Sequence, residues 1–159
     1  MDWGLIVDTD SLYREMEERF FSQERVDYLQ LPKILLEMMN LDSFEMQKAL
    51  VLRRKGTMWK SFSDSLERFG YDIVLTERGV QNMTLALEMS QMSMVAGGLV
   101  LVTASKRVGP IVDSLKKLNK PIKIAAFEWV DSSDGVDPKS FLQLDRRCLW
   151  TGEQGLNAK

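Results

Sequence analysis

The sequence predicts an α/β protein with three layers, α/β/α, and a mainly parallel sheet of about five strands. Five short runs rich in Val, Ile and Leu are continuously apolar, which indicates strands that are covered on both faces. Segments with helical periodicity separate these runs. Such alternation is typical of parallel sheets built by right-handed crossovers, so we expect helices on both sides of the sheet.

The expected elements follow one another in a regular order. Strands are expected over residues 5–7, 49–52, 73–75, 99–102 and 122–127, and helices over 11–21, 31–39, 58–69, 82–95 and 109–118. Ser11 is suited to cap the first helix, and Gly70 can adopt the left-handed conformation that ends the third. Gly97 and Gly98 stop the fourth helix. Pro121 favours an extended backbone where the last strand begins.

Length and composition predict one domain in the cytoplasm. The chain has 159 residues, enough for one complete core, so we assign residues 1–150 to a single domain and 151–159 to a flexible tail. No apolar stretch approaches the ~20 residues that span a bilayer, and the N-terminus lacks a basic segment before an apolar one. Cys148 is the single cysteine, which fits a reducing compartment. We expect no membrane partner.

The chain contains no histidine and has a net charge of −2. The first fact excludes histidine bases, Ser-His-Asp triads and ordinary histidine-containing zinc sites, leaving carboxylate, Lys or Tyr chemistry. The second argues against broad attraction to nucleic acid, although a local basic patch can still bind it.

Two carboxylates come where the first strand ends. Asp8 and Asp10 follow the apolar residues 4–7. A buried strand places such side chains at the edge of the sheet, where Mg²⁺ or phosphate chemistry is commonly found. This pair is the first candidate site.

The helix over 82–95 is rich in methionine and carries a polar stripe that includes Glu88. Three interpretations remain open. The polar stripe is solvated while the methionines pack in the core; Glu88 points toward Asp8 and Asp10; or the surplus methionines form a homodimer or protein-binding surface.

Basic residues surround the end of the second strand. Arg53, Arg54 and Lys55 precede Trp59, and this combination can hold a phosphate backbone while a base stacks on the indole. The alternative is a solvated strand end followed by a tryptophan that packs inward. A second group of lysines, Lys116, Lys117, Lys120 and Lys123, is explained by a solvated helix end and turn.

Residues 5–127 resemble the NYN domain family, a branch of the PIN-like ribonucleases. The opening strand ends in Asp8-Thr9-Asp10, residues 78–88 resemble the family's glycine-valine-aspartate run with a second acid at Glu88, and the fourth strand leads into Ser105-Lys106-Arg107. The resemblance implies a PIN-like fold. It also implies carboxylates that hold Mg²⁺ or Mn²⁺ and activate the water that attacks an RNA phosphodiester.

The sequence departs from the family where the chemistry is expected. Asn82, Ser105 and Arg107 stand where the family has acids, so that Asp8, Asp10 and Glu88 alone are left. We therefore expect Lys106 or Arg107 to pair with the opening acids in place of a metal ion. The resulting hypothesis is a catalytically weakened or inactive relative that binds RNA, through residues 53–55, 59, 106 and 107, or a protein partner, and that needs no cofactor.

Two enzymatic alternatives remain open. In the first, Asp8, Asp10 and Glu88 hold one Mg²⁺ or Mn²⁺ ion in an active ribonuclease. In the second, the opening motif is similar to that of haloacid dehalogenase-like phosphatases, with Asp8 as nucleophile and Asp10 as general acid and base. Thr103 or Ser105 would then bind the phosphate.

Overall fold

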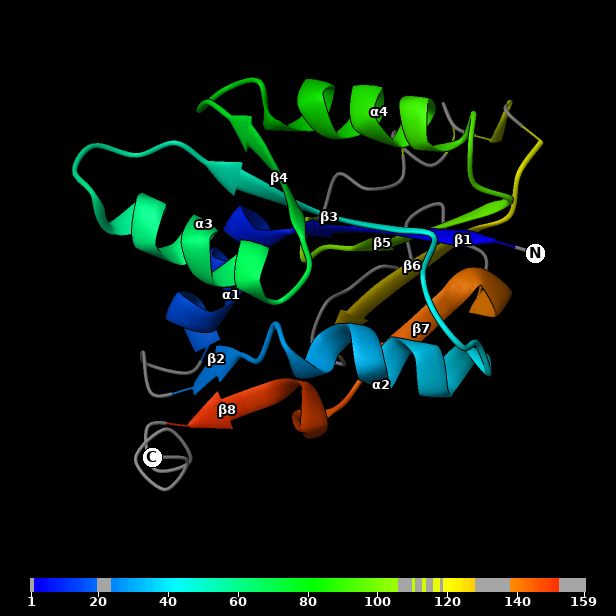
Figure 1. The fold of residues 1–159 in the computed structure, drawn as a ribbon, viewed down its shortest axis with the longest axis horizontal. Coiled ribbons are helices and arrows are strands. Elements are labelled where there is room, and N and C mark those ends of the chain that lie inside the picture. The colour runs from blue at the N-terminus through cyan, green and yellow to red at the C-terminus, as the bar shows by residue number, and fades with distance from the viewer. Residues whose placement is uncertain are drawn as a thin grey trace.

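A parallel sheet forms the centre of the structure (Figure 1), which is a computed structural model. It describes residues 2–19, 24–105, 110, 113, 116–117, 119–127 and 138–151. In this part of the chain six strands lie in the order β4 (Asp72–Thr76), β3 (Met46–Leu52), β1 (Trp3–Asp8), β5 (Gly98–Val102), β6 (Ile122–Phe127) and β7 (Phe141–Leu144). All neighbouring pairs are parallel. The predicted α/β class is therefore confirmed.

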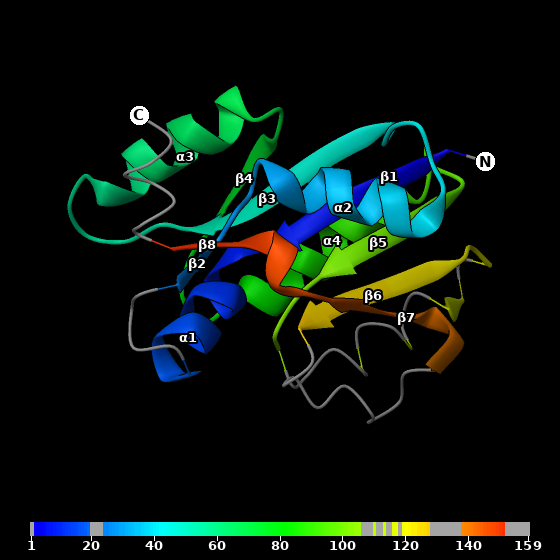
Figure 2. The ribbon, with the colours of Figure 1, turned by 90° about the horizontal axis from the view of Figure 1, so that it is seen from below.

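Helices cover both faces of this sheet (Figures 1 and 2). One face carries α1 (Thr9–Arg19), α2 (Gln30–Met39) and α3 (Met58–Arg68), together with an antiparallel ribbon of β2 (Glu24–Val26) and β8 (Leu149–Thr151). The other face carries α4 (Gln81–Met92). Short 3₁₀ helices over Pro138–Ser140 and Arg146–Cys148 flank β7. The arrangement has the three expected layers.

The sheet separates two hydrophobic clusters because successive side chains of a strand point to opposite faces. In β1, Leu5 and Val7 pack with α1 and α2, whereas Ile6 packs with α4. The central strands β1 and β5 are buried along their whole length, as their continuous apolar runs predict, whereas the edge strand β4 is only partly buried. Gly70 has a φ of 95°, in agreement with its expected place after a helix.

Several short elements were not predicted. β2 and β8 have three residues each and form hydrogen bonds with one another. Because they are so short, neither shows an apolar run in the sequence that would predict a strand. β7 adds a sixth strand to the five expected. The predicted tail began at residue 151, but Thr151 still pairs in β8. Residues 152–159 and most of the predicted helix over 109–118 lie outside the described residues.

A membrane-spanning element is not found in the described part of the chain. None of the helices described there combines the length and the apolar character that crossing a bilayer requires.

Candidate functional site

The carboxyl ends of β1 and β5 lie side by side at the centre of the sheet. Val7 is in register with Val102, so that Asp8 is next to Thr103. β1 has β3 on one side and β5 on the other. The chain adds β3 and β4 on the first side and then returns to add β5 and β6 on the second, so the direction in which strands are added reverses at β1. In open α/β sheets such a reversal marks the crevice where ligands bind. The predicted meeting of the first and fourth strands is confirmed.

Asp8 is a buried carboxyl with uncharged partners. Its exposed fraction is 4%, the Ser11 N–H donates to Oδ1 over 3.4 Å, and the Thr103 hydroxyl donates to Oδ2 over 3.1 Å. Burial raises the pKa of Asp8; hydrogen bonds from Ser11 and Thr103 lower it, and the charge of Asp10 raises it further. The net effect is a pKa above the ordinary aspartate value.

Asp10 is equally buried but has charged partners. Arg54 Nη2 lies 2.6 Å from Asp10 Oδ1, and Arg14 Nε lies 3.1 Å from Oδ2. The arginine side chains are 44% and 63% exposed, against 4% for Asp10. Both carboxylate oxygens therefore accept charge-assisted bonds from cations that come in from the surface.

The structure does not bring Glu88 to these two acids. Its carboxylate lies 2.9 Å from Lys48 Nζ, beneath α4. Among the described residues there is no group of three acids that could hold a metal ion. The predicted pocket of Asp8, Asp10 and Glu88 is corrected in this respect, because Lys48 in β3 binds Glu88 on the α4 side.

The polar residues Thr84 and Glu88 of α4 are partly buried and contact the sheet, whereas Gln91 is exposed. Besides Glu88, Thr84 is engaged: its Oγ1 accepts a 2.9 Å hydrogen bond from the Thr76 hydroxyl. Met89 and Met92 are buried in the core, while Met83 and Met94 are exposed. The helix thus turns some of its methionines outward and keeps a polar contact with β3 and β4.

Arginine side chains occupy the position that was predicted for Lys106 or Arg107. Both of those residues lie outside the described part of the chain. Arg54 reaches Asp10 because it follows β3, and β3 is the neighbour of β1. Arg14 reaches it from the next turn of α1. The signals in the sequence were the i, i+4 spacing of Asp10 and Arg14 and the basic end of the second strand.

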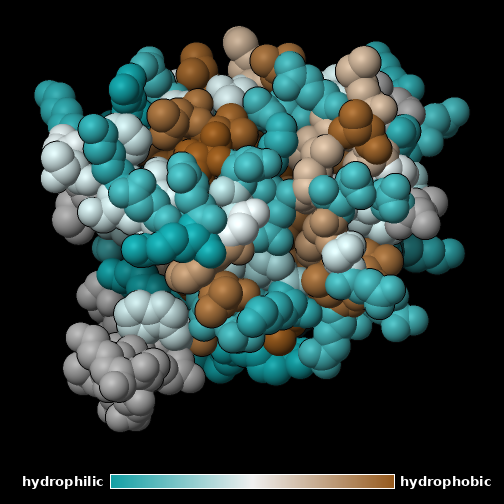
Figure 3. Space-filling model, in the orientation of Figure 1, coloured by the Kyte–Doolittle hydropathy of each residue, from teal (hydrophilic) through white to brown (hydrophobic). Residues whose placement is uncertain are grey.

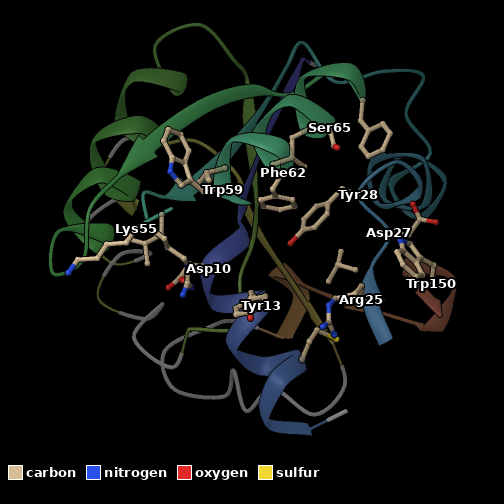
Figure 4. A pocket seen from close by; sticks show the side chains of 17 residues that line it. Asp10, Tyr13, Arg25, Asp27, Tyr28, Lys55, Trp59, Phe62, Ser65 and Trp150 are labelled. Atoms are coloured by element: carbon tan, nitrogen blue, oxygen red, sulfur yellow. The ribbon is translucent and has the colours of Figure 1, made fainter. Parts of the chain in front are cut away.

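A cavity of about 590 Å³ opens beside Asp10 (Figure 4). It lies between α1, α3 and the ribbon of β2 and β8. We call it the aromatic cavity, because six of its lining residues are aromatic: Tyr13, Tyr28, Trp59, Phe62, Phe69 and Trp150. Its charged lining residues are Asp10, Arg25, Asp27, Arg54 and Lys55.

Cations lie over two of the aromatic rings of the cavity. The Arg54 guanidinium lies 5.2 Å from the ring centre of Tyr13. Trp59 has the Arg53 guanidinium at 5.6 Å and the Lys60 ammonium at 5.8 Å. These are cation–π distances. The predicted basic cluster is therefore at the mouth of a cavity, and Trp59 lines that cavity, half-buried.

Several lining residues were missed by the sequence analysis. Tyr28 follows β2 and Trp150 lies in β8. The sequence has no apolar periodicity that predicts either strand. Tyr13 is on the first helix, where the sequence suggests a charged, solvated face. Burial raises the pKa of Tyr28, with smaller contributions from the charges of Asp8 and Asp10. Its hydroxyl is therefore a neutral hydrogen-bonding group near the acids.

The geometry of the two opening acids does not fit a divalent ion. Mg²⁺ gives up its water reluctantly and is usually held by one or two ionised carboxylates together with substrate phosphates. Burial raises the pKa of Asp8, and both oxygens of Asp10 lie within ion-pair distance of guanidinium groups. An ion at this place would need to displace Arg54 or Arg14.

Comparisons with known proteins inform the fold. Neither a protein-family model nor a curated protein sequence matches the chain. A crystal structure of a protein of unknown function from Vibrio parahaemolyticus is similar, with a TM-score of 0.78, 16% sequence identity, and coverage of 94% of this chain and 96% of that chain. At this identity the likeness shows a shared fold over nearly the whole of both chains.

Proposed function

We propose that the protein binds single-stranded RNA without cleaving it, as a catalytically inactive relative of the NYN nucleases. The observation that carries the proposal is the position of Arg54. This one side chain neutralises Asp10 and lines the aromatic cavity beside it. The Arg54 guanidinium therefore lies between Asp10 and the surface where an RNA strand would bind.

The acids are poorly placed for metal-assisted cleavage. Such cleavage needs carboxylates that hold an ion and polarise a water or a phosphate oxygen. A divalent ion about 4 Å from a guanidinium is repelled by roughly 8 kcal/mol at an effective dielectric near 20, twice the value for two unit charges. Since Asp10 has two guanidinium partners, it contributes charge balance at this edge of the sheet.

The aromatic cavity and its basic mouth support binding of a strand. Proteins that bind single strands combine cations that follow the phosphates with aromatic side chains on which bases stack. Here Arg53, Arg54 and Lys55 are exposed next to such side chains. The net charge of −2 means that this local patch, rather than the whole surface, must attract the RNA.

The experiment is a titration of short, fluorescently labelled single-stranded RNA followed by anisotropy. Loss of the Arg54 cation should weaken binding about tenfold or more in Arg54→Ala, because a phosphate contact and a stacked cation are lost together. Lys48→Met is the matched control, since it removes a cation from β3 on the opposite face. Equal affinities for wild type and Arg54→Ala would contradict the proposal.

A second candidate function is self-association through the outer side of α4. Met83 and Leu87 are exposed one turn apart on α4, and Leu75 on the edge strand β4 is exposed as well. Val80 and Met94, just beyond the two ends of the helix, are also exposed. Hydrophobic side chains are visible at this upper part of the molecule (Figure 3). Light scattering should show a dimer that Leu87→Glu dissociates; a monomer at all concentrations would exclude it.

A further inference from the structure

The two ends of the aromatic cavity differ in charge. Lys55 and Asp10 lie at one end and Asp27 and Trp150 at the other (Figure 4). Arg54, paired with Asp10, belongs to the first end. A ligand that fills the cavity therefore meets two cations at the first end and a carboxylate beside an indole at the other. Arg25, the cross-strand neighbour of Trp150, also lines the cavity, and its guanidinium lies 3.7 Å from the Glu17 carboxylate.

We infer that this cavity binds one guanosine monophosphate unit, with the phosphate at Arg54 and Lys55 and the base between the aromatic walls near Asp27. The inference rests on the proposed function, because it names the part of an RNA that the cavity recognises. The unit can come from a strand or from a free nucleotide, and its chemistry is the same in both.

The aromatic walls provide surfaces for a planar base. On one side Tyr28 and Phe62 pack edge to face, with ring centres 5.4 Å apart. On the other side Trp150 in β8 is the cross-strand neighbour of Arg25 in β2. Figure 4 shows Tyr28 between Phe62 and Trp150. A volume of about 590 Å³ is in the range of cavities that hold small ligands.

Asp27 gives the cavity a preference for a base with hydrogen-bond donors. Its Oδ1 accepts the backbone N–H groups of Leu29 at 3.2 Å and Gln30 at 3.1 Å, and these bonds fix the carboxylate at the start of α2. Oδ2 is then the oxygen for a ligand. Guanine presents two adjacent donors on its Watson–Crick edge, whereas adenine presents a ring acceptor beside its amino group. A carboxylate accepts from the first and repels the ring nitrogen of the second.

The opposite end is suited to phosphate. A guanidinium has five N–H donors, and the bond to Asp10 uses Nη2 of Arg54. The remaining donors and the exposed Lys55 ammonium provide charge-assisted bonds for phosphate oxygens. The buried Asp10 holds Arg54 in place before the ligand arrives.

The test is a titration with guanosine monophosphate and adenosine monophosphate, followed by intrinsic tryptophan fluorescence. We expect saturable binding of the guanosine nucleotide, about tenfold tighter than of the adenosine nucleotide. Trp150→Ala should weaken it by about tenfold through loss of stacking, with Met83→Ala on the far helix as control. Asp27→Asn should abolish the preference while the asparagine oxygen still accepts the two backbone N–H groups. Absence of saturable binding, or equal affinities in the wild type, would overturn the inference.

Two further outcomes distinguish an RNA ligand from a free nucleotide, and the inference about the cavity from the proposed function. Tighter binding of an oligouridylate with a single guanosine than of the free nucleotide assigns the site to RNA, and the reverse assigns it to a free nucleotide; both support the cavity. If RNA binds in an Arg54-dependent manner without any preference for guanosine, the inference fails and the proposed function stands.

Discussion

Asp10 and Glu88 are both paired with a cation from β3 or its end, yet the two pairs belong to different kinds of surroundings. Glu88 meets Lys48 at 2.9 Å beneath α4, in a partly buried place beside the apolar side chains of that layer. Asp10 meets Arg54 at 2.6 Å at the carboxyl end of the sheet, beside a cavity. The first pair joins a helix to the sheet. The second presents a cation where a ligand can reach it.

The comparison shows that position relative to the strand ends, and not the residue type, separates a structural pair from a site. Residues in the middle of the sheet are covered by α4, whereas the ends of β1, β3 and β5 lie next to the aromatic cavity and the crevice. Substitutions on the α4 face should therefore change stability. Those at the strand ends should change binding.

The largest expected effect is on the α4 face. Met89 is completely buried, and Met89→Ala should lower the free energy of unfolding by about 3 kcal/mol, since it removes core contacts and leaves a cavity. Met83 is 72% exposed on the same helix, so that Met83→Ala should change it by less than about 0.5 kcal/mol. Urea denaturation measures both. Equal losses would show that α4 does not lie as described.

The next effect concerns the structural pair itself. Lys48→Met leaves the Glu88 carboxylate without its 2.9 Å partner in a partly buried place, and should cost roughly 1 to 2 kcal/mol of stability. RNA affinity should not change, because the pair is on the face away from the cavity. A loss of RNA binding in this variant would remove the distinction between the two pairs.

The smallest expected effect is that of Asp8→Asn, which should raise the free energy of unfolding instead of lowering it. Burial raises the pKa of Asp8 in the folded protein, so the folded state holds this proton more tightly than the unfolded chain does. Stability is then lost as the pH rises from the ordinary aspartate range through the raised pKa. Asp8→Asn removes the ionisation and should stabilise the protein by about 1 kcal/mol at neutral pH.

Denaturation as a function of pH checks this prediction. The curves of the wild type and Asp8→Asn should converge in acid, below the ordinary aspartate range. Asp10→Asn is the matched control and should be destabilised at neutral pH, because two guanidinium groups lose a charged partner. A destabilised Asp8→Asn at neutral pH would mean that the Asp8 carboxylate is favourably ionised.

The sequence predicted the sheet and the opening acids because each is carried by a local pattern. Continuous apolar runs mark buried parallel strands, and Asp8 and Asp10 follow directly from the first of them. Arg54 was recognised as basic but not as the partner of Asp10, since the pairing depends on which strand lies beside β1. Strand order is a long-range property.

Glu88 and the aromatic cavity show more clearly what local sequence patterns do not predict. The polar stripe of its helix and the family resemblance both grouped Glu88 with the opening acids, but Lys48 in β3 binds it beneath α4. The cavity draws Tyr28 and Trp150 from strands of three residues or their flanks, whose pairing is tertiary. No period of two or 3.6 residues can reveal such elements.

The central claim is that cations of the protein hold Asp10 in place of a metal ion, and one measurement tests it most directly. Labelled single-stranded RNA is incubated with the protein in Mn²⁺ or in EDTA, and both its affinity and its length are determined. The account predicts intact RNA and affinities that agree within about twofold in the two conditions. Cleavage that requires Mn²⁺ and is lost in Asp10→Asn would contradict it.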